Sequence, residues 1–256
     1  MQIKDKVVVV TGTASGIGLA LATRFVREGA TVIASDMNAE VGAQKAAEIG
    51  ARFVAANVAK EEDIVRLIDD VYAHEGPIDL FCSNAGIAIG AGPETLDRHW
   101  QLINDVNVMS HVWAARHLVP RMLERGEGYL LNTASAAGLL ASMGSAPYGV
   151  TKHAGVALAE HLSIQYGDRG IRVSVLCPQA VDTNMLRMAG ATAASVDGVL
   201  NTDAVAQTVI EAMDAETFLI LTHAEVKEYM GRKLDRDRWL RGMRRLRDKT
   251  GEKARA

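Results

Sequence analysis

One stretch near the N-terminus decides the fold: Val7-Val8-Val9-Val10-Thr11-Gly12-Thr13-Ala14-Ser15-Gly16-Ile17-Gly18. The short valine run predicts a strand that is buried on both faces of a sheet. The glycines predict a tight turn, and the helical periodicity from Ile17 to Glu28 predicts that the chain then enters a helix. A buried strand, a glycine-rich turn and a helix in this order are typical of the start of a βαβ unit.

The same alternation continues along the chain. The expected strands are Val7–Thr11, Thr31–Ser35, Arg52–Ala56, Leu80–Ser83, Tyr129–Thr133, Arg172–Cys177 and Phe218–Leu221. Helix-period segments separate them, among them Ile17–Glu28, Glu61–His74, Arg98–Glu124 and Tyr148–Tyr166. This pattern predicts an α/β fold: a single Rossmann-like, doubly wound domain whose seven-stranded parallel sheet has helices on both faces.

Composition excludes several other classes of protein. The 256 residues are 48% hydrophobic and 23% charged, which allows a full core and excludes a disordered chain. Two cysteines, expected as buried thiols, exclude a disulfide scaffold. No apolar run approaches the ~20 residues of a membrane span, and none resembles a signal peptide, so we expect a cytoplasmic protein with no membrane partner.

The net charge of −3 is unevenly distributed, and it gives no reason to expect nucleic-acid binding. Residues 225–256 contain 12 Lys and Arg against 6 Asp and Glu, so this tail carries +6 and the preceding 224 residues carry −9. Apolar residues recur in the tail at near-helical spacing: Val226, Met230, Leu234, Leu240, Met243 and Leu246. This spacing predicts an amphipathic helix, docked on the acidic body or on a neighbouring subunit.

The glycine-rich turn has the residues that a pyrophosphate site needs. Gly12 allows the tight turn, Gly16 allows close approach of a phosphate, and Gly18 allows the helix to pack against the sheet. The N-terminus of the helix supplies free N–H groups and a positive dipole end. Glycine-rich turns also occur in ordinary βα connections, so the turn by itself leaves both interpretations open.

Asp36 stands at the end of the second expected strand, 18 residues beyond Gly18. A carboxylate there can accept hydrogen bonds from the ribose hydroxyls of NAD, and it repels the 2′-phosphate of NADP. Met37 and Asn38 follow, so no Lys or Arg stands beside it, and NAD is expected rather than NADP. The alternative is that Asp36 only caps the next helix.

Tyr148 and Lys152 stand four residues apart at the start of an expected helix, and therefore on one helix face. A free phenol has a pKa of about 10 and is a poor base, whereas a nearby ammonium favours the phenolate. Tyr229 and Lys233 repeat the spacing in the charged tail, where we expect no catalysis. Ser135 follows an expected strand and can hydrogen-bond the same substrate oxygen, although an isolated serine there is usually a turn residue.

In order and spacing, these motifs resemble the short-chain dehydrogenase/reductase family. The resemblance rests on Gly12-x-x-x-Gly16-x-Gly18, Asp36, Ser135 and Tyr148-x-x-x-Lys152. Four further stretches are similar to family landmarks: Ser83-Asn84-Ala85-Gly86, Asn107-Val108-Met109-Ser110, Asn132-Thr133-Ala134-Ser135 and Pro178-Gln179-Ala180-Val181-Asp182-Thr183. The resemblance implies an NAD-binding and catalytic domain over residues 1–222 and a basic helical extension over residues 223–256.

The resemblance also implies a reaction, namely hydride transfer between a nicotinamide and a secondary alcohol or ketone. It implies that Tyr148 exchanges the hydroxyl proton, that Lys152 lowers the pKa of Tyr148 and contacts the nicotinamide ribose, and that Ser135 holds the substrate oxygen. Asn107 is expected to position a water for proton relay. A homodimer or homotetramer and no metal are expected. The implied cofactor contacts are Gly12, Ser15, Gly16, Ile17, Gly18, Asp36, Asn57, Val58, Asn84, Ala85, Gly86, Tyr148, Lys152, Pro178, Val181 and Thr183.

Three positions depart from the family pattern: Ser83 and Asn57 stand where Asn and Asp are common, and Gln179 replaces a glycine. The segments expected to line the substrate pocket, residues 87–89, 139–143 and 184–200, are apolar. The last of these resembles a lid, and its only basic residue is Arg187. They favour a neutral, apolar substrate, unless these side chains only pack the lid.

Two other functions remain possible at this stage. One is an epimerase or dehydratase of the same family, although such chains have a larger C-terminal substrate region. The other is a non-catalytic dinucleotide sensor, although such proteins tend to lose the tyrosine or the lysine.

Overall fold

The computed structural model describes residues 1–90, 92–189 and 193–251. Its single sheet has the order β3-β2-β1-β4-β5-β6-β7, and every neighbouring pair is parallel. The strands are β1 (Val7–Thr11), β2 (Thr31–Asp36), β3 (Arg52–Ala55), β4 (Leu80–Ser83), β5 (Gly128–Thr133), β6 (Ile171–Cys177) and β7 (Leu219–Leu221). The predicted doubly wound α/β fold is confirmed, and strand boundaries differ from the expected ones by one residue or less.

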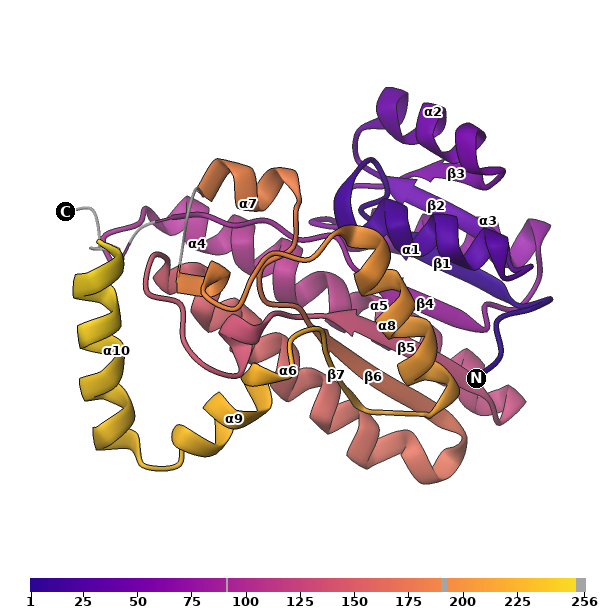
Figure 1. Ribbon diagram of the computed structural model, residues 1–256. Helices are drawn as coiled ribbons and strands as arrows, with labels where there is room; N and C mark the ends of the chain where they lie inside the picture. The colour runs from indigo at the N-terminus through magenta and orange to yellow at the C-terminus, as the bar shows by residue number, and fades with distance from the viewer. Residues whose placement is uncertain (91, 190–192, 252–256) are drawn as a thin grey trace.

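Helices cover both faces of the sheet (Figure 1). Val8 and Val10 of β1 point into the core under α1 (Gly16–Arg27) and α8 (Thr202–Asp214), whereas Val9 points into the opposite core. That second core lies under α3 (Glu61–His74), α5 (Ser110–Arg125) and α6 (Ala146–Tyr166), and α2 (Ala39–Ile49) packs beside β3. Both faces of β1 are therefore apolar because both are buried, which explains the uninterrupted valine run.

The strand order reverses at β1, which pairs with β2 on one side and with β4 on the other. Connections leave in opposite directions from such a point, so a crevice opens at the carboxyl ends of these strands. Thr11, the last residue of β1, holds the crevice together because its hydroxyl donates to Cys82 O and accepts from the backbone N–H groups of Asn84 and Ala85.

The helix expected over Arg98–Glu124 is interrupted. The structure has α4 (Asp97–Asn104), a π-helical turn η1 (Asp105–Met109) and then α5. Within η1 the side chain of Asn107 bonds both the N–H and the carbonyl of Ile87, each at 2.9 Å. We attribute the wider turn to this tertiary contact, which helical periodicity does not encode.

The C-terminal extension also differs from the expectation of one helix. It forms α9 (Glu225–Arg232) and α10 (Arg236–Thr250), and the chain turns between them at the exposed Leu234. Asp235 starts α10 because its carboxylate accepts a hydrogen bond from Arg238 N at 3.0 Å. Residues 252–256 of the expected tail helix and 190–192 of the expected lid lie outside the described residues. The remaining short helices are α7 (Asn184–Ala189), η2 (Ala136–Gly138), η3 (Gly167–Arg169) and η4 (Ala193–Ser195).

No helix in residues 1–90, 92–189 or 193–251 has the length and apolarity of a membrane span.

Candidate active site

The carboxyl ends of the strands open into one large cavity of about 2020 Å³. The glycine turn lines one end of it, the residues after β5 and β6 line the middle, and α10 lines the far wall. The structure brings together in this lining all of the expected site residues except Gly18 and Asn107. Those two lie immediately behind it.

The turn after β1 fits a pyrophosphate. Gly12 and Gly16 adopt the left-handed backbone region, with φ of +77° and +61°, which other residues avoid. A Cβ on Gly18 would lie 2.1 Å from Gly12 O, so the absence of a side chain lets α1 approach the turn. Ser15 begins α1 without a side-chain cap, and the backbone N–H groups of Ile17 and Gly18 have no partner among the described residues. These donors point to an anion at the helix N-terminus.

Asp36 lies at the cofactor end of the cavity, with both carboxylate oxygens held by the backbone. One oxygen accepts from Ala14 N at 3.0 Å, and the other accepts from Asn38 N at 2.9 Å. The helix cap of α2 is Asn38, whose side chain accepts from Val41 N, so Asp36 is not the capping residue. The lining residues beside Asp36 include no Lys or Arg in the described part of the chain.

The other expected dinucleotide contacts follow β3 and β4. Asn57 and Val58 line the cavity, but the Asn57 side chain is already engaged, because its oxygen accepts from Ala59 N at 3.0 Å. Asn84 fastens three strand ends, since its amide donates to Thr11 O and its oxygen accepts from the Thr133 hydroxyl. Asn84 therefore stabilises the carboxyl ends of β1, β4 and β5 and also lines the cavity.

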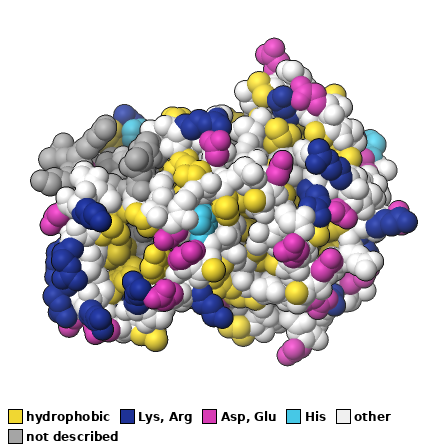
Figure 2. All heavy atoms as spheres, in the orientation of Figure 1, with side chains coloured by type: hydrophobic (Ala, Val, Ile, Leu, Met, Phe, Trp, Pro, Cys, Tyr) yellow, Lys and Arg dark blue, Asp and Glu magenta, His cyan; other side chains and the backbone are white. Residues whose placement is uncertain are grey.

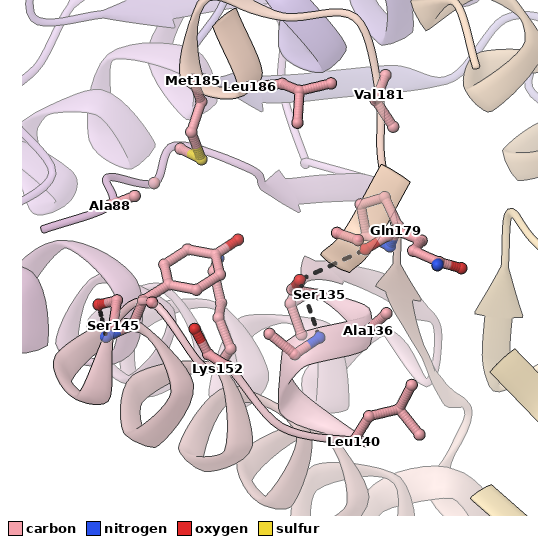
Figure 3. Close-up of a pocket in the computed structure, with 18 of the residues that line it drawn as sticks. Ala88, Ser135, Ala136, Leu140, Ser145, Lys152, Gln179, Val181, Met185 and Leu186 are labelled. Atoms are coloured by element: carbon pink, nitrogen blue, oxygen red, sulfur yellow. Dashed lines mark hydrogen bonds between the residues drawn. The ribbon is translucent and has the colours of Figure 1, made fainter. Parts of the chain in front are cut away.

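Ser135, Tyr148 and Lys152 all line the cavity. Figure 3 shows Ser135 and Lys152 there. The Ser135 hydroxyl accepts from Ala137 N at 3.1 Å and lies 3.4 Å from Pro178 O. Tyr148 is in the first turn of α6. Lys152 lies one turn later, with its ammonium 5.6 Å from the Tyr148 ring centre and donating to Thr133 O at 3.1 Å.

Burial shifts the pKa values of the two ionisable groups in opposite senses. It lowers the pKa of Lys152 to about 8, and it raises the pKa of Tyr148 above its ordinary value, against the opposing effect of a hydrogen bond with Ser135. The net shift in the pKa of Tyr148 is therefore upward, because desolvation outweighs the hydrogen bond with Ser135. The expectation that Lys152 lowers the pKa of Tyr148 stays a prediction. At neutral pH the site therefore holds a phenol beside an ammonium.

Asn107 lies behind Lys152 and does not line the cavity. Its side chain is fully engaged, because in addition to Ile87 it bonds the hydroxyl of Thr151 at 3.2 Å. One turn on, His111 is 2% exposed, and neither ring nitrogen has a partner among the described residues. Burial, assisted by the charge of Lys152, lowers the pKa of His111 to about 3, so this imidazole is neutral. Sequence reasoning missed it; the only signal is a histidine on the apolar face of α5.

Gln179 and the second tyrosine–lysine pair make structural hydrogen bonds around the cavity. Gln179 Nε2 donates to Asp197 Oδ2 at 2.8 Å, and the Tyr229 hydroxyl donates to Asp197 Oδ1 at 2.9 Å. Lys233 Nζ donates to Leu139 O at 2.6 Å. Tyr229 and Lys233 therefore fix α9 to two different walls of the cavity.

The substrate side of the cavity is lined by the three apolar segments that the sequence indicates, and by one segment that it does not. The first group includes Ala88, Leu140, Met185 and Leu186, which Figure 3 shows around the reaction centre. The unexpected lining comes from the C-terminal extension, namely from Tyr229, Gly231 and Arg232 of α9 and from one side of α10. The spacing of apolar residues in α10 can be recognised in the sequence, but the sequence does not show that this helix lies against the cavity.

Comparison with known proteins places this geometry in a family. The family described as short chain dehydrogenase matches residues 6–194. The 1-deoxy-11-beta-hydroxypentalenate dehydrogenase of Streptomyces exfoliatus is 38% identical over 240 residues, covering 89% of this chain and 86% of that protein. The 3beta-hydroxysteroid dehydrogenase 2 of Eggerthella lenta is 36% identical over 185 residues, covering 69% and 71%.

A solved structure is similar over almost its whole length. The short chain dehydrogenase/reductase of Burkholderia phymatum, crystallised with NAD, superposes with a TM-score of 0.83 at 26% identity, covering 93% of this chain and 96% of that one. The relatives named above are dehydrogenases that act on hydroxyl groups. The chain therefore belongs to the short-chain dehydrogenase/reductase family of oxidoreductases.

Proposed function

We propose that this protein is an NAD-dependent dehydrogenase that interconverts a secondary alcohol and a ketone. The observation that carries the proposal is the meeting of Ser135, Tyr148 and Lys152 in one cavity that also reaches the glycine turn and Asp36. Hydride donor and acceptor can then lie in contact, which is the main requirement of the reaction.

NAD held at the glycine turn and Asp36 would supply the hydride acceptor. In the oxidising direction Tyr148 first loses its own proton to solvent, and as the phenolate it then accepts the hydroxyl proton of the substrate. Ser135 holds the substrate oxygen next to the phenol, because its hydroxyl lies on the same side of the cavity. Lys152 keeps a positive charge beside the ring, which stabilises the phenolate once it forms. Since the side chain of Asn107 is engaged with Ile87, any part that Asn107 takes in proton relay uses its backbone.

The preference for NAD rests on Asp36. Its two oxygens are aimed by Ala14 N and Asn38 N, and the neighbouring lining contains no described cation that would attract a 2′-phosphate. A phosphate at this position would face a fixed carboxylate at short range. The NAD-bound relative from Burkholderia phymatum agrees with this preference.

For the substrate we propose a hydroxyl group on a bulky, apolar skeleton. The lining of the substrate side is dominated by Ala, Leu and Met, and two relatives take their names from a hydroxypentalenate and a hydroxysteroid. Apolar walls of this kind hold a substrate mainly by excluding water from its skeleton. A small diol would leave most of the apolar lining of the cavity in contact with water.

We further propose that the chain forms a homo-oligomer through α4, α5 and α6. Three large apolar side chains on α4 and α6 are exposed in the single chain, with exposed fractions of 45% at Leu102, 57% at Val150 and 76% at Ile164. Burial of such a surface against a second copy removes it from water.

A screen of alcohols and ketones tests the proposed function. Purified protein is mixed with fused-ring and small secondary alcohols and either NAD or NADP, and the appearance of reduced nicotinamide is followed by absorbance. We expect turnover of fused-ring alcohols with NAD. Activity that requires NADP would refute the role of Asp36, and tight NADH binding without turnover of any alcohol would favour a dinucleotide sensor.

A further inference from the structure

The C-terminal extension is held across the mouth of the cavity. Tyr229 of α9 donates to Asp197 of the lid. Lys233, directly after α9, donates to the carbonyl of Leu139, and its Nζ lies 3.2 Å from His153 Nε2. The chain then turns from α9 into α10 at one end of the molecule (Figure 1). Side chains of α10 line the cavity. The helix is therefore positioned to contact whatever occupies the substrate side.

One stripe of α10 is apolar. Trp239, Met243 and Leu246 line the cavity and are half-buried. Their spacings of four and three residues place them on one side of the helix. Figure 2 shows hydrophobic side chains gathered in the hollow beside α10. This stripe extends the apolar wall of the cavity away from the reaction centre.

A second stripe of the same helix is basic. Arg238, Arg245 and Lys249 also line the cavity, and at 100° per residue they lie within about 40° of one another around the helix, roughly 100° from the apolar stripe. We name these three residues the basic rim. Along the axis the rim spans about 16 Å, the length of 11 residues at 1.5 Å each.

The basic rim is not ion-paired in the described part of the chain. None of its three side chains forms an ion pair with a described carboxylate. The carboxylate of Asp235, which also lines this wall, is used to cap α10. In the lid, Arg187 is paired with Asp182 at 2.9 Å. The rim therefore makes the outer wall of the substrate side positive.

We infer that the substrate carries an anionic group, specifically a carboxylate, on the end of its apolar skeleton that lies away from the reacting hydroxyl. The inference rests on the proposed function, and it revises the expectation of a neutral substrate, which rested on three apolar lining segments and on Arg187 as the only basic residue of the lid. An apolar skeleton lies along Trp239 and Met243 while its carboxylate meets the adjacent rim. Guanidinium groups suit this role because their fork of N–H donors matches the two carboxylate oxygens.

Binding to the NADH-loaded enzyme tests the inference without relying on turnover. The probes are deoxycholate, a fused-ring hydroxy acid used below its micelle concentration, and its methyl ester, which has the same skeleton but no charge. We expect the acid to bind about tenfold more tightly than the ester at low ionic strength, and the preference to fall as salt is added. The triple variant R238Q/R245Q/K249Q should remove most of the preference.

The matched control is R241Q/R244Q/R247Q. It removes the same charge from α10 at positions outside the cavity lining. We expect this control to keep at least half of the preference. Equal binding of acid and ester, equal loss in both triple variants, or tighter binding of a steroid sulfate than of the carboxylate would overturn the inference.

The two proposals can fail separately. Tyr148→Phe should leave the acid–ester preference unchanged because the rim lies on α10 and Tyr148 on α6. A retained preference in an enzyme that oxidises no alcohol would refute the proposed function alone. Oxidation of fused-ring alcohols by an enzyme that shows no preference for binding the acid would refute the role of the basic rim alone.

Discussion

Gly18→Ala tests the cofactor turn. The new Cβ would lie 2.1 Å from Gly12 O and 2.6 Å from Asn84 Nδ2, whereas real Cβ contacts essentially never fall under 3.0 Å. The turn must therefore move by about 1 Å. Gly12 cannot move easily because its N–H donates to Ser35 O at 2.8 Å and Ala85 lies beside it, so close that a Cβ on Gly12 would come within 2.9 Å of Ala85 Cα.

Overpacking of this kind costs about 1–3 kcal/mol, which lowers Tm by about 3–10 °C in a protein of this size. A displacement of about 1 Å in a cofactor site reduces kcat/KM by roughly 100-fold. The assays are thermal unfolding and fluorescence titration with NADH. Gly231→Ala is the control, because its Cβ would enter open space within α9 and should raise stability by up to about 1 kcal/mol. An unchanged Tm together with an NADH affinity within twofold of wild type would refute this account of the turn.

Three further predictions concern other parts of the site. Asp36→Ala should reduce the ratio of NAD to NADP efficiency by about tenfold or more, whereas Glu40→Ala on the exposed side of α2 should not; steady-state kinetics with both cofactors decides. Lys152→Met should abolish turnover without lowering Tm at neutral pH, because burial of the ammonium opposes folding, as its pKa of about 8 indicates. The folded state releases this proton before the unfolded state does, so wild-type stability should rise relative to the variant between about pH 8 and the ordinary lysine pKa of about 10.4, and thermal melts across that range should detect it. Tyr229→Phe, which loses the bond to Asp197, should raise KM a few-fold and leave kcat within twofold.

Much of the fold and of the cofactor end is predictable from sequence because the signals there are local. Val7–Val10 are apolar on both faces, and the sheet buries both faces. The glycines of the turn are required by backbone angles and by a close contact with Gly12 itself. Asp36 ends its strand, and the direction of the strand places it at the crevice.

The parts that sequence did not predict depend on contacts between distant segments. The π-helical turn coincides with the contact between Asn107 and Ile87, 20 residues apart in the chain. The upward shift in the pKa of Tyr148 comes from burial of its hydroxyl in the folded protein. The spacing of residues in the sequence does not show how deeply a side chain is buried. The position of α10 depends on the hydrogen bonds that Tyr229 makes to Asp197 and that Lys233 makes to Leu139. The sequence does not show these contacts, so it could not predict which surface the apolar and basic stripes of α10 would face.

The most direct test of the central claim is a comparison of Tyr148→Phe with Tyr229→Phe. Both variants remove one hydroxyl from a tyrosine that lines the cavity and stands four residues before a lysine. With a fused-ring alcohol and NAD, Tyr148→Phe is predicted to lose at least about 100-fold in kcat, the lower end of the usual contribution of a general acid–base group. Its NADH affinity should stay within about threefold of wild type, and Tyr229→Phe should keep its turnover. Turnover by Tyr148→Phe within tenfold of wild type would contradict the claim that Tyr148 exchanges the substrate proton.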